Sequence, residues 1–294
     1  MSIRTVTEQA YAKINLYLEV TSRREDGFHD IESIMQSISL GDELTFTLTP
    51  REERSVSLKI LGNDALKNDE SNLVLRAVRA YEELRLINGR LEITLKKRIP
   101  TEAGLGGGSA DAAATLRALN RLADEPVDDI ELFNIAAELG SDVPFCLRGG
   151  THICRGRGEI LSPARSMKNL HLVIVNSGEK VSTPKAYAEL DRLYDNFKFV
   201  RPDDDRKTAF ESLLAGKTDK LYNLFEDAVL PSSPLAKAAK ERLIFLGATA
   251  ALMSGSGATV FGVFESREAA HLAKEKILGE FDFVCYATEK TTIL

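Results

Sequence analysis

The segment PTEAGLGGGSADAAA spans residues 100–114, and four of its residues between positions 104 and 108 are glycines. Glycine clusters lose more backbone entropy on folding than other segments, so they usually serve a geometric purpose. A predicted strand (Leu91–Leu95) precedes the cluster and a predicted helix (Ser109–Leu122) follows it. This order places free main-chain N–H groups at a helix N-terminus, where a phosphate is stabilised. Ser109 could cap the helix or offer its hydroxyl to a phosphate or to Mg²⁺.

The common phosphate-binding motifs do not describe this segment. A P-loop requires a lysine directly before its Ser or Thr, and residue 108 is glycine. A dinucleotide fingerprint that starts at Gly104 and Gly106 would need a third glycine where Ser109 stands. The segment therefore predicts a phosphate site of another type, with a flexible surface loop as the alternative.

Two earlier segments also carry polar side chains that could do chemistry. In YAKINLYLEV (residues 11–20), Lys13 and Asn15 project from one face of a predicted strand, opposite its apolar face. In RREDGFH (residues 23–29), Phe28 and His29 follow an Asp-Gly turn signal. From these residues alone, a solvated strand face and a surface histidine remain the alternatives.

Two later segments place candidate residues in turns. Asp142 lies in LGSDVPFCL, where Pro144 restricts Val143 to an extended conformation and so turns the chain out of a helix. An ordinary turn or cap residue is the alternative for Asp142. The sequence SGSG at 254–257 lies between two predicted strands and can form a tight turn, with a plain hairpin as the alternative.

Composition excludes several classes of protein. The 294 residues include 38 Lys+Arg and 44 Asp+Glu, a formal net charge of −6, which argues against a generally basic nucleic-acid or membrane-surface protein. We find neither an apolar run of ~20 residues nor a secretory signal, and therefore expect a cytoplasmic protein. The three cysteines (Cys146, Cys154 and Cys285) form no cluster with histidines, so we expect neither a disulfide framework nor a structural zinc site.

Hydrophobic patterns predict the elements that must position these residues. Strands are predicted at 11–20, 42–49, 55–61, 91–95, 170–175, 250–253 and 259–264. Helices are predicted at 72–86, 109–122, 129–139, 236–246 and 267–277. The charged segment 191–220 is expected to form helices and exposed connections on a solvated surface. This interleaving predicts an α+β protein.

The length favours two domains, because single cores rarely grow beyond roughly 250–300 residues. Gly156, Gly158 and Pro163 punctuate the chain where we place the boundary. We therefore predict an N-terminal domain at 1–160 and a C-terminal domain at 161–294, and we allow the last strand to return to the N-terminal domain.

The glycine-rich segment resembles the phosphate-binding motif of the GHMP kinases (galacto-, homoserine, mevalonate and phosphomevalonate kinases), whose pattern is P-x-x-x-G-L-G-[GS]-[GS]-[SA]. The resemblance implies the two-domain α+β GHMP kinase fold, with a ribosomal-protein-like N-terminal domain and an active site in the cleft between the domains. It implies ATP and Mg²⁺ as cofactors, and it makes SGSG a glycine loop that approaches the phosphates. It implies ATP contacts at Asn72, Lys97, Pro100, Thr101, Glu102, Ala103, Gly104, Leu105, Gly106, Gly107, Gly108, Ser109 and Ala110.

The segments AKINLYLEV and REDGFH are similar to one branch of this family, which phosphorylates a cytidine diphosphate-linked methylerythritol. Its relatives that act on homoserine, mevalonate or galactose lack the D-G-[YF]-H segment. The branch carries G-[SA]-D-V-P, in which the aspartate is the catalytic base, and this pattern matches Asp142. Lys13 would be its electrostatic partner, since a lysine keeps a neighbouring carboxylate ionised. We predict a Lys13–Asp142 pair in one cleft, although 129 positions separate them.

The resemblance also implies residues for the substrate. Cytosine would stack between Phe28 and Tyr187, and His29 would read the edges of the base. Asn15 would contact the hydroxylated end of the substrate, and Thr183 belongs to a loop (VSTPKAY) along it. Phenylalanine at 28 stacks as well as tyrosine but lacks its hydroxyl. For Tyr187, a packed helix residue is the alternative.

The function implied is transfer of the γ-phosphoryl group of ATP to the 2-hydroxyl of that substrate, in isopentenyl diphosphate biosynthesis by the non-mevalonate pathway. We expect a monomer or weak homodimer that binds neither nucleic acid nor membrane, and we assign no metal ligands. A kinase for homoserine, mevalonate or a sugar is one alternative. A non-catalytic nucleotide- or metabolite-binding regulator is another. RNA binding is disfavoured by the net charge of −6 and the lack of a basic-aromatic stripe.

Overall fold

A computed structural model describes residues 2–85, 87–194 and 202–291 of the chain. A long antiparallel hairpin, β1 (Arg4–Arg23) and β2 (His29–Thr49), forms the centre of the first sheet. The order of this sheet is β3-β4-β2-β1-β8, with β5 paired to β2 and β6 paired to β5. The bounds of its other strands are Ser55–Leu61 (β3), Arg90–Lys96 (β4), Thr151–Arg155 (β5), Ile160–Pro163 (β6) and Tyr222–Asn223 (β8).

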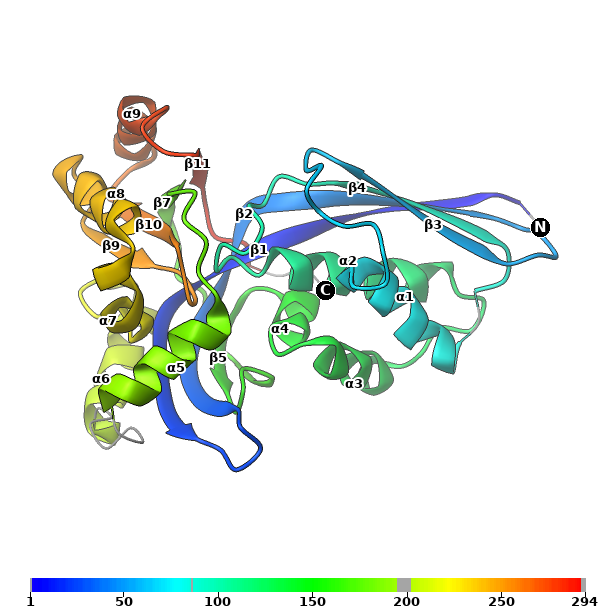
Figure 1. The fold of residues 1–294 in the computed structure, drawn as a ribbon, viewed down its shortest axis with the longest axis horizontal. Coiled ribbons are helices and arrows are strands. Elements are labelled where there is room, and N and C mark those ends of the chain that lie inside the picture. Colours follow the sequence, from blue (N-terminus) through cyan, green and yellow to red (C-terminus); the bar gives the residue numbers. More distant parts are fainter. Residues whose placement is uncertain (1, 86, 195–201, 292–294) are drawn as a thin grey trace.

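Four helices lie along one side of the long strands, as Figure 1 shows. They are α1 (Leu73–Leu84), α2 (Gly107–Leu122), α3 (Asp129–Leu139) and α4 (Val143–Arg148). Helix α2 is the central one, since its residues 110–119 are all buried and rich in alanine. Small side chains let α2 pack closely on β1, α1 and α4, and the glycine-rich segment leads directly into this packed helix.

The second sheet has the order β11-β7-β10-β9. Its strands are His171–Asn176 (β7), Ala250–Met253 (β9), Thr259–Phe264 (β10) and Phe283–Ala287 (β11). The remaining helices belong to the same half of the molecule, namely α5 (Thr183–Tyr194), α6 (Asp203–Leu214), α7 (Phe225–Val229), η2 (Leu230–Ser232), α8 (Pro234–Phe245) and α9 (Arg267–Ile277). The mixture of helices and sheets confirms the predicted α+β class.

Several elements have the predicted bounds, among them β3, β9, β10, α3 and α9. The prediction was too short for the hairpin, where strands were expected only at 11–20 and 42–49. Register shifts at Tyr11/Lys13, Asn15/Tyr17 and Val20/Ser22 interrupt the alternation of buried and exposed residues that marks a strand in sequence. Backbone pairing nevertheless continues from Arg23↔His29 to Arg4↔Leu48.

Helix α2 begins two residues before the predicted start at Ser109, so the expectation that Ser109 caps it is wrong. Gly106 occupies the N-cap with a φ of 68°, and no side chain caps the helix. A left-handed φ favours glycine, which explains why the chain has glycine at this turn. The first N–H groups of α2 are therefore left for a ligand.

The charged segment 191–220 is helical in part, as expected, and 195–201 lie outside the described residues. The expectation of a solvated surface is wrong at two of its positions. Arg206 is only 15% exposed at its side chain and pairs with Glu32 of β2 at 3.0 Å, while Asp191 pairs with His29. Charge runs indicate surface in general, and these side chains instead join α5 and α6 to the hairpin.

The first sheet takes strands from both halves of the chain. Residue 160, where the predicted boundary falls, begins β6 of the first sheet, and β8 pairs with β1 although it follows α6 in sequence. β11 belongs to the second sheet, and the residues after it return to β2, where Ser39 N donates to Thr288 O at 2.7 Å. The division into 1–160 and 161–294 stays a prediction.

The three cysteines are free thiols, and Cys146 and Cys154 are buried. Burial raises the pKa of the Cys154 thiol to about 12, so packing rather than reactivity describes this residue. Among the described residues, no helix is both long and apolar enough to cross a membrane.

A buried charge cluster, defined as Asp42, Lys97 and Asp111, lies between β2, β4 and α2. Lys97 Nζ lies 2.5 Å from Asp42 Oδ2 and 2.8 Å from Asp111 Oδ2. Burial raises the pKa of Asp111 from 3.8 to about 8, and Lys97 offsets only part of this effect. The folded chain thus holds a proton on Asp111 that the unfolded chain releases.

The free energy of unfolding should therefore fall as pH rises from about 4 to about 8, because the stability contributed by the protonated group is lost as pH approaches its raised pKa. Asp111→Asn cannot ionise and should flatten this pH dependence. Denaturant unfolding of both proteins between about pH 5 and pH 8 measures the difference. If the free energy of unfolding changed equally with pH in the two proteins, the raised pKa would not belong to Asp111.

Candidate active site

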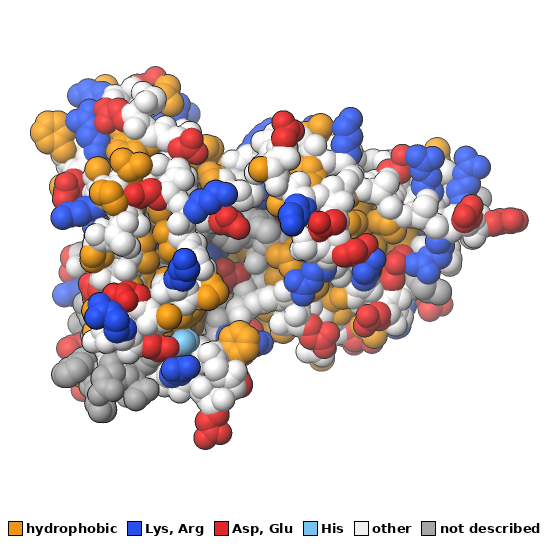
Figure 2. Space-filling model, viewed as in Figure 1, with side chains coloured by type: hydrophobic (Ala, Val, Ile, Leu, Met, Phe, Trp, Pro, Cys, Tyr) orange, Lys and Arg blue, Asp and Glu red, His pale blue; other side chains and the backbone are white. Residues whose placement is uncertain are grey.

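An open cleft of about 1020 Å³ lies between the two halves of the molecule. Figure 2 shows the hollow on this face. The hairpin of β1 and β2, the glycine-rich segment, the loop before α4, the start of α5 and the SGSG turn all contribute to its walls. These segments come from most of the chain, so only the folded protein assembles the cleft.

Lys13 and Asp142 meet in this cleft, and their predicted pairing is confirmed. Lys13 Nζ lies 3.6 Å from Asp142 Oδ2, and the side chains are 5% and 30% exposed. Lys13 reaches this position because its own N–H donates to Leu105 O at 3.0 Å, which binds β1 to the glycine-rich segment. Asp142 occupies the N-cap position of α4 without capping it, so its carboxylate stays available to the cleft.

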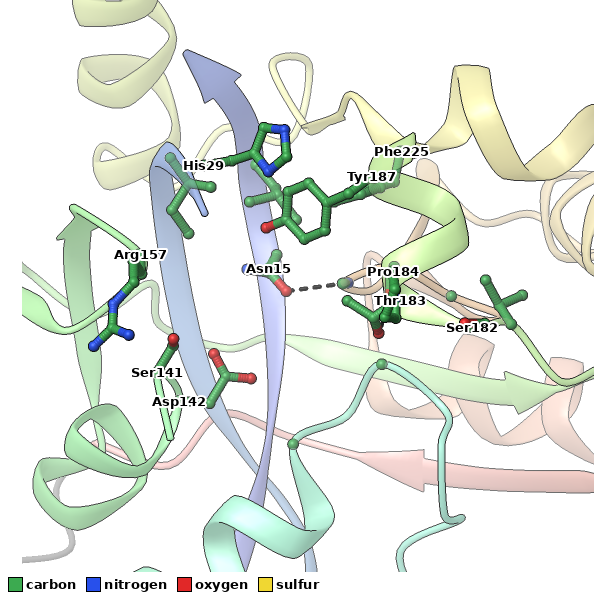
Figure 3. Close-up of a pocket in the computed structure, with 18 of the residues that line it drawn as sticks. Asn15, His29, Ser141, Asp142, Arg157, Ser182, Thr183, Pro184, Tyr187 and Phe225 are labelled. Atoms are coloured by element: carbon green, nitrogen blue, oxygen red, sulfur yellow. Dashed lines mark hydrogen bonds between the residues drawn. The ribbon is translucent and has the colours of Figure 1, made fainter. Parts of the chain in front are cut away.

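Asn15 lines the cleft beside Lys13 and connects the two halves of the molecule. Its Oδ1 accepts hydrogen bonds from Lys13 Nζ at 2.8 Å and from Gly255 N at 3.1 Å. Its Nδ2 donates to Ser33 Oγ at 2.9 Å, so the amide is satisfied on both sides. Figure 3 shows Asn15 between Asp142 and the pair His29 and Tyr187.

The two glycine loops contact each other, which agrees with the approach of SGSG to the phosphate loop that the family resemblance implied. Ser254 Oγ donates to Gly104 O at 2.9 Å. Gly104 has a φ of 75°, and a Cβ built there would lie only 2.1 Å from Ser254 O. Gly106 has a φ of 68°, and its Cβ would lie 3.0 Å from Lys13 Cγ. Both positions thus require glycine because of backbone conformation and close approach.

Only part of the predicted ATP segment faces the cleft. Glu102, Gly104, Gly106 and Ser109 line it. The remaining members are not among its lining residues, namely Pro100, Thr101, Ala103, Leu105, Gly107, Gly108 and Ala110. The contacts predicted for ATP along this segment stay predictions.

Asn72 and Lys97 do not line the cleft. Asn72 caps α1, since its Oδ1 accepts from Val74 N at 3.0 Å and its Nδ2 donates to Lys67 O at 2.9 Å. Lys97 belongs to the buried charge cluster. The adenosine contacts predicted for both residues stay predictions.

An aromatic group closes one end of the cleft. The rings of His29 and Tyr187 stack with centroids 4.5 Å apart and an angle of 16°, and Phe225 meets Tyr187 edge-on at 4.9 Å. His29 Nε2 lies 2.8 Å from Asp191 Oδ1. Burial raises the pKa of the Tyr187 hydroxyl, so it stays protonated at neutral pH.

Phe28 is 51% exposed, and Arg157 Cζ lies 4.9 Å from the centre of its ring. Phe28 and Tyr187 both line the cleft, and the predicted stacking of a base between them stays a prediction. Thr183 also lines the cleft, where its Oγ1 lies 2.8 Å from Ser256 Oγ.

The sequence analysis missed Asp191, Arg157 and Lys180, which also line the cleft. Asp191 lies four residues after Tyr187 in α5, and such pairs share a helix face, so this spacing could have revealed it. Arg157 stands between two glycines in RGRG, a turn signal that we used only for a boundary. Lys180 pairs with Glu102 at 3.8 Å from the opposite wall.

This arrangement suits transfer of a phosphoryl group to an alcohol. Uncapped N–H groups at α2 can hold phosphates, and a carboxylate beside a lysine can orient a hydroxyl and accept its proton. Among the described residues, no group of three His, Cys, Asp or Glu side chains is arranged to hold a metal ion by itself.

Comparison with known proteins agrees with this chemistry. The families described as GHMP kinases N terminal domain and GHMP kinases C terminal match residues 72–150 and 207–282. A protein of Gloeobacter violaceus named 4-diphosphocytidyl-2-C-methyl-D-erythritol kinase is 38% identical, over 99% of this chain and 97% of its own length. A protein of the same name from Solibacter usitatus is 41% identical, over 92% of this chain and 85% of its own.

Solved structures lead to the same family. A crystal structure of a 4-(cytidine 5'-diphospho)-2C-methyl-D-erythritol kinase superposes with a TM-score of 0.81 and 34% identity. The match covers 97% of this chain and 99% of that one. Because identity, coverage and fold all agree over nearly the whole length, this chain belongs to the GHMP kinases.

Proposed function

We propose that this chain is an ATP-dependent kinase that phosphorylates the 2-hydroxyl of 4-diphosphocytidyl-2-C-methyl-D-erythritol in the non-mevalonate pathway to isopentenyl diphosphate. The observation that carries the proposal is the Lys13–Asp142 pair beside the glycine loop, in a chain whose relatives carry that name. A cytoplasmic location and a monomeric or weakly dimeric state remain predictions.

Asp142 is the base in this proposal. Its carboxylate accepts the proton of the 2-hydroxyl as the hydroxyl oxygen bonds to the γ-phosphorus of ATP, and the bond from that phosphorus to the bridging oxygen of ADP breaks. Lys13, 3.6 Å away, places a positive charge beside the carboxylate and stabilises negative charge on the transferring group. Asn15 holds the ammonium of Lys13 in place through a bond of 2.8 Å.

The phosphates of ATP would lie against the N-terminus of α2. The uncapped N–H groups after Gly106 point to this end of the helix, where the helix dipole favours an anion. Mg²⁺ fits here as the ion of MgATP, since it takes most of its ligands from phosphates and water and needs only one or two from protein. Glu102 and Ser109 line the cleft and would hold it, and it would supply charge neutralisation.

The cytidine end of the substrate would lie at the aromatic end of the cleft. Phe28, His29 and Tyr187 offer ring faces there, and nucleobases stack on such faces. His29 Nε2 lies 2.8 Å from Asp191 Oδ1, and this contact orients the ring toward the proposed base site.

The test of the proposed function is an ADP-release assay on the purified chain with parallel acceptors. We expect turnover with 4-diphosphocytidyl-2-C-methyl-D-erythritol and at least 100-fold lower kcat/KM with homoserine, mevalonate and galactose, because a buried polar site rejects acceptors that leave its groups unpaired by roughly this factor or more. Faster phosphorylation of any of the three would refute the proposed substrate.

Asp142→Asn removes the base while it preserves side-chain volume. We expect kcat to fall by about 10²–10⁴-fold, the usual contribution of a positioned base, with little change in the KM of either substrate. Asp124→Asn is the matched control, since Asp124 is an exposed carboxylate paired only with Arg4 in the described contacts. Retention of near wild-type kcat by Asp142→Asn would rule out its role as the base.

Gly104→Ala should separate the two glycine loops, because the added Cβ would clash with Ser254 O at 2.1 Å and the φ of 75° disfavours alanine. We expect the KM for ATP to rise about tenfold or more, in steady-state assays with saturating acceptor. Gly216→Ala is the control for backbone strain alone, since Gly216 has a φ of 88° and a Cβ there would meet nothing within 4 Å. An equal rise of the KM for ATP in both variants would show that backbone strain, and not loss of the loop contact, causes the effect.

A further inference from the structure

We propose that the buried charge cluster of Asp42, Lys97 and Asp111 is a positioning device that joins the two ends of the glycine loop and thereby sets the affinity for ATP. None of the three side chains lines the cleft, and in this proposal they act through the loop. The inference rests on the proposed binding of ATP phosphates at this loop.

Asp42 holds the chain where it enters the loop. Its Oδ1 accepts hydrogen bonds from Arg98 N at 2.5 Å and Ile99 N at 2.9 Å. Its Oδ2 accepts from Lys97 Nζ at 2.5 Å. A single carboxylate of β2 therefore binds the three residues that precede Pro100.

Lys97 extends this connection to the chain where it leaves the loop. Its Nζ donates to Asp111 Oδ2 at 2.8 Å, and Asp111 lies in the first turns of α2. Entry and exit also touch directly, because a Cβ on Gly107 would lie 3.0 Å from Ile99 Cγ2 and 3.2 Å from Lys97 Nζ. The segment between these anchors contains only residues 100–106.

The cluster is a poor source of stability. Asp42, Lys97 and Asp111 are 0%, 7% and 3% exposed, and polar groups this deeply buried lose much of their mutual attraction to desolvation. Asp111 Oδ1 has no hydrogen-bond partner among the described residues. Apolar side chains of similar size would stabilise the fold as well or better. What the cluster provides instead is one directional connection between β2, the loop entry and α2.

Such a connection bears on ligand affinity. A loop that contains Gly104 and Gly106 at positive φ has many accessible conformations when its ends are loose, and ordering it on binding lowers affinity. When both ends of the loop are fixed, the loop loses less conformational entropy on binding ATP. Loosening one end should therefore weaken ATP binding and leave the acceptor substrate and the chemical step nearly unaffected.

Asp111→Ala tests this because it removes the bond from Lys97 to α2, while the bond from Lys97 to Asp42 remains. The variant should fold, because alanine is the best helix former and the lost carboxyl is incompletely hydrogen-bonded. We expect ATP to bind about tenfold more weakly by titration calorimetry with MgATP. At saturating ATP, kcat and the KM of the cytidyl substrate should stay within about twofold of wild type, and the free energy of unfolding should not fall.

Two further variants complete the experiment. Asp111→Asn retains an acceptor for Lys97 and should restore ATP affinity to within about threefold of wild type. Glu43→Ala is the matched control, since Glu43 follows Asp42 and forms an exposed pair with Lys96, which precedes Lys97, at 2.6 Å. This control should bind ATP like wild type.

Wild-type ATP affinity in Asp111→Ala would overturn the inference, as would a combined loss of stability, ATP binding and acceptor binding. Failure of Asp111→Asn to restore affinity would also overturn it. If the wild-type chain itself binds no MgATP, the proposed function fails and the inference fails with it. The binding measurement on the wild type thus separates the two failures.

Discussion

The backbone contact between Gly104 and Ser254 is the constraint on which the rest of the site depends. The two residues are 150 positions apart, and Ser254 Oγ donates to Gly104 O at 2.9 Å. No Cβ fits at Gly104, and a Cβ at Gly255 would lie 2.9 Å from Gly104 O. With the loops this close, Gly255 N reaches Asn15, and Asn15 in turn holds Lys13 near Asp142. The relative position of the two halves is therefore part of the active-site geometry.

Charge in this protein is arranged locally. The chain carries a net charge of −6, yet the ligands proposed for its cleft are anions. Main-chain N–H groups at α2 attract phosphates without a side-chain charge, and Lys13 places a single ammonium beside the base. Lys180 and Arg157 add further cations to the lining of the cleft. The global charge and the character of the cleft are thus independent.

Buried polar groups in this fold determine position more than stability. Asn15 joins Lys13 of β1 to the SGSG turn through one amide oxygen. Arg117 of α2 binds Gln9 O of β1 and Cys146 O of α4 at 2.9 and 3.2 Å. The strands and helices joined in this way are those that carry Lys13 and Asp142. Directional bonds of this kind tolerate little displacement, whereas apolar packing tolerates more.

The sequence by itself determined the family, the α+β class and the local elements, because strand alternation, helix periodicity and motif spacing depend on neighbours within a few residues. It therefore predicted α3 and α9 with their bounds and singled out Lys13, Asp142 and the glycine segment. Tertiary structure alone decided that Asp191 reaches His29, that Lys97 is buried between two aspartates, and that Gly106 rather than Ser109 is the N-cap of α2. Each of these depends on packing between segments remote in sequence, or on a backbone angle that glycine permits and no local pattern reveals.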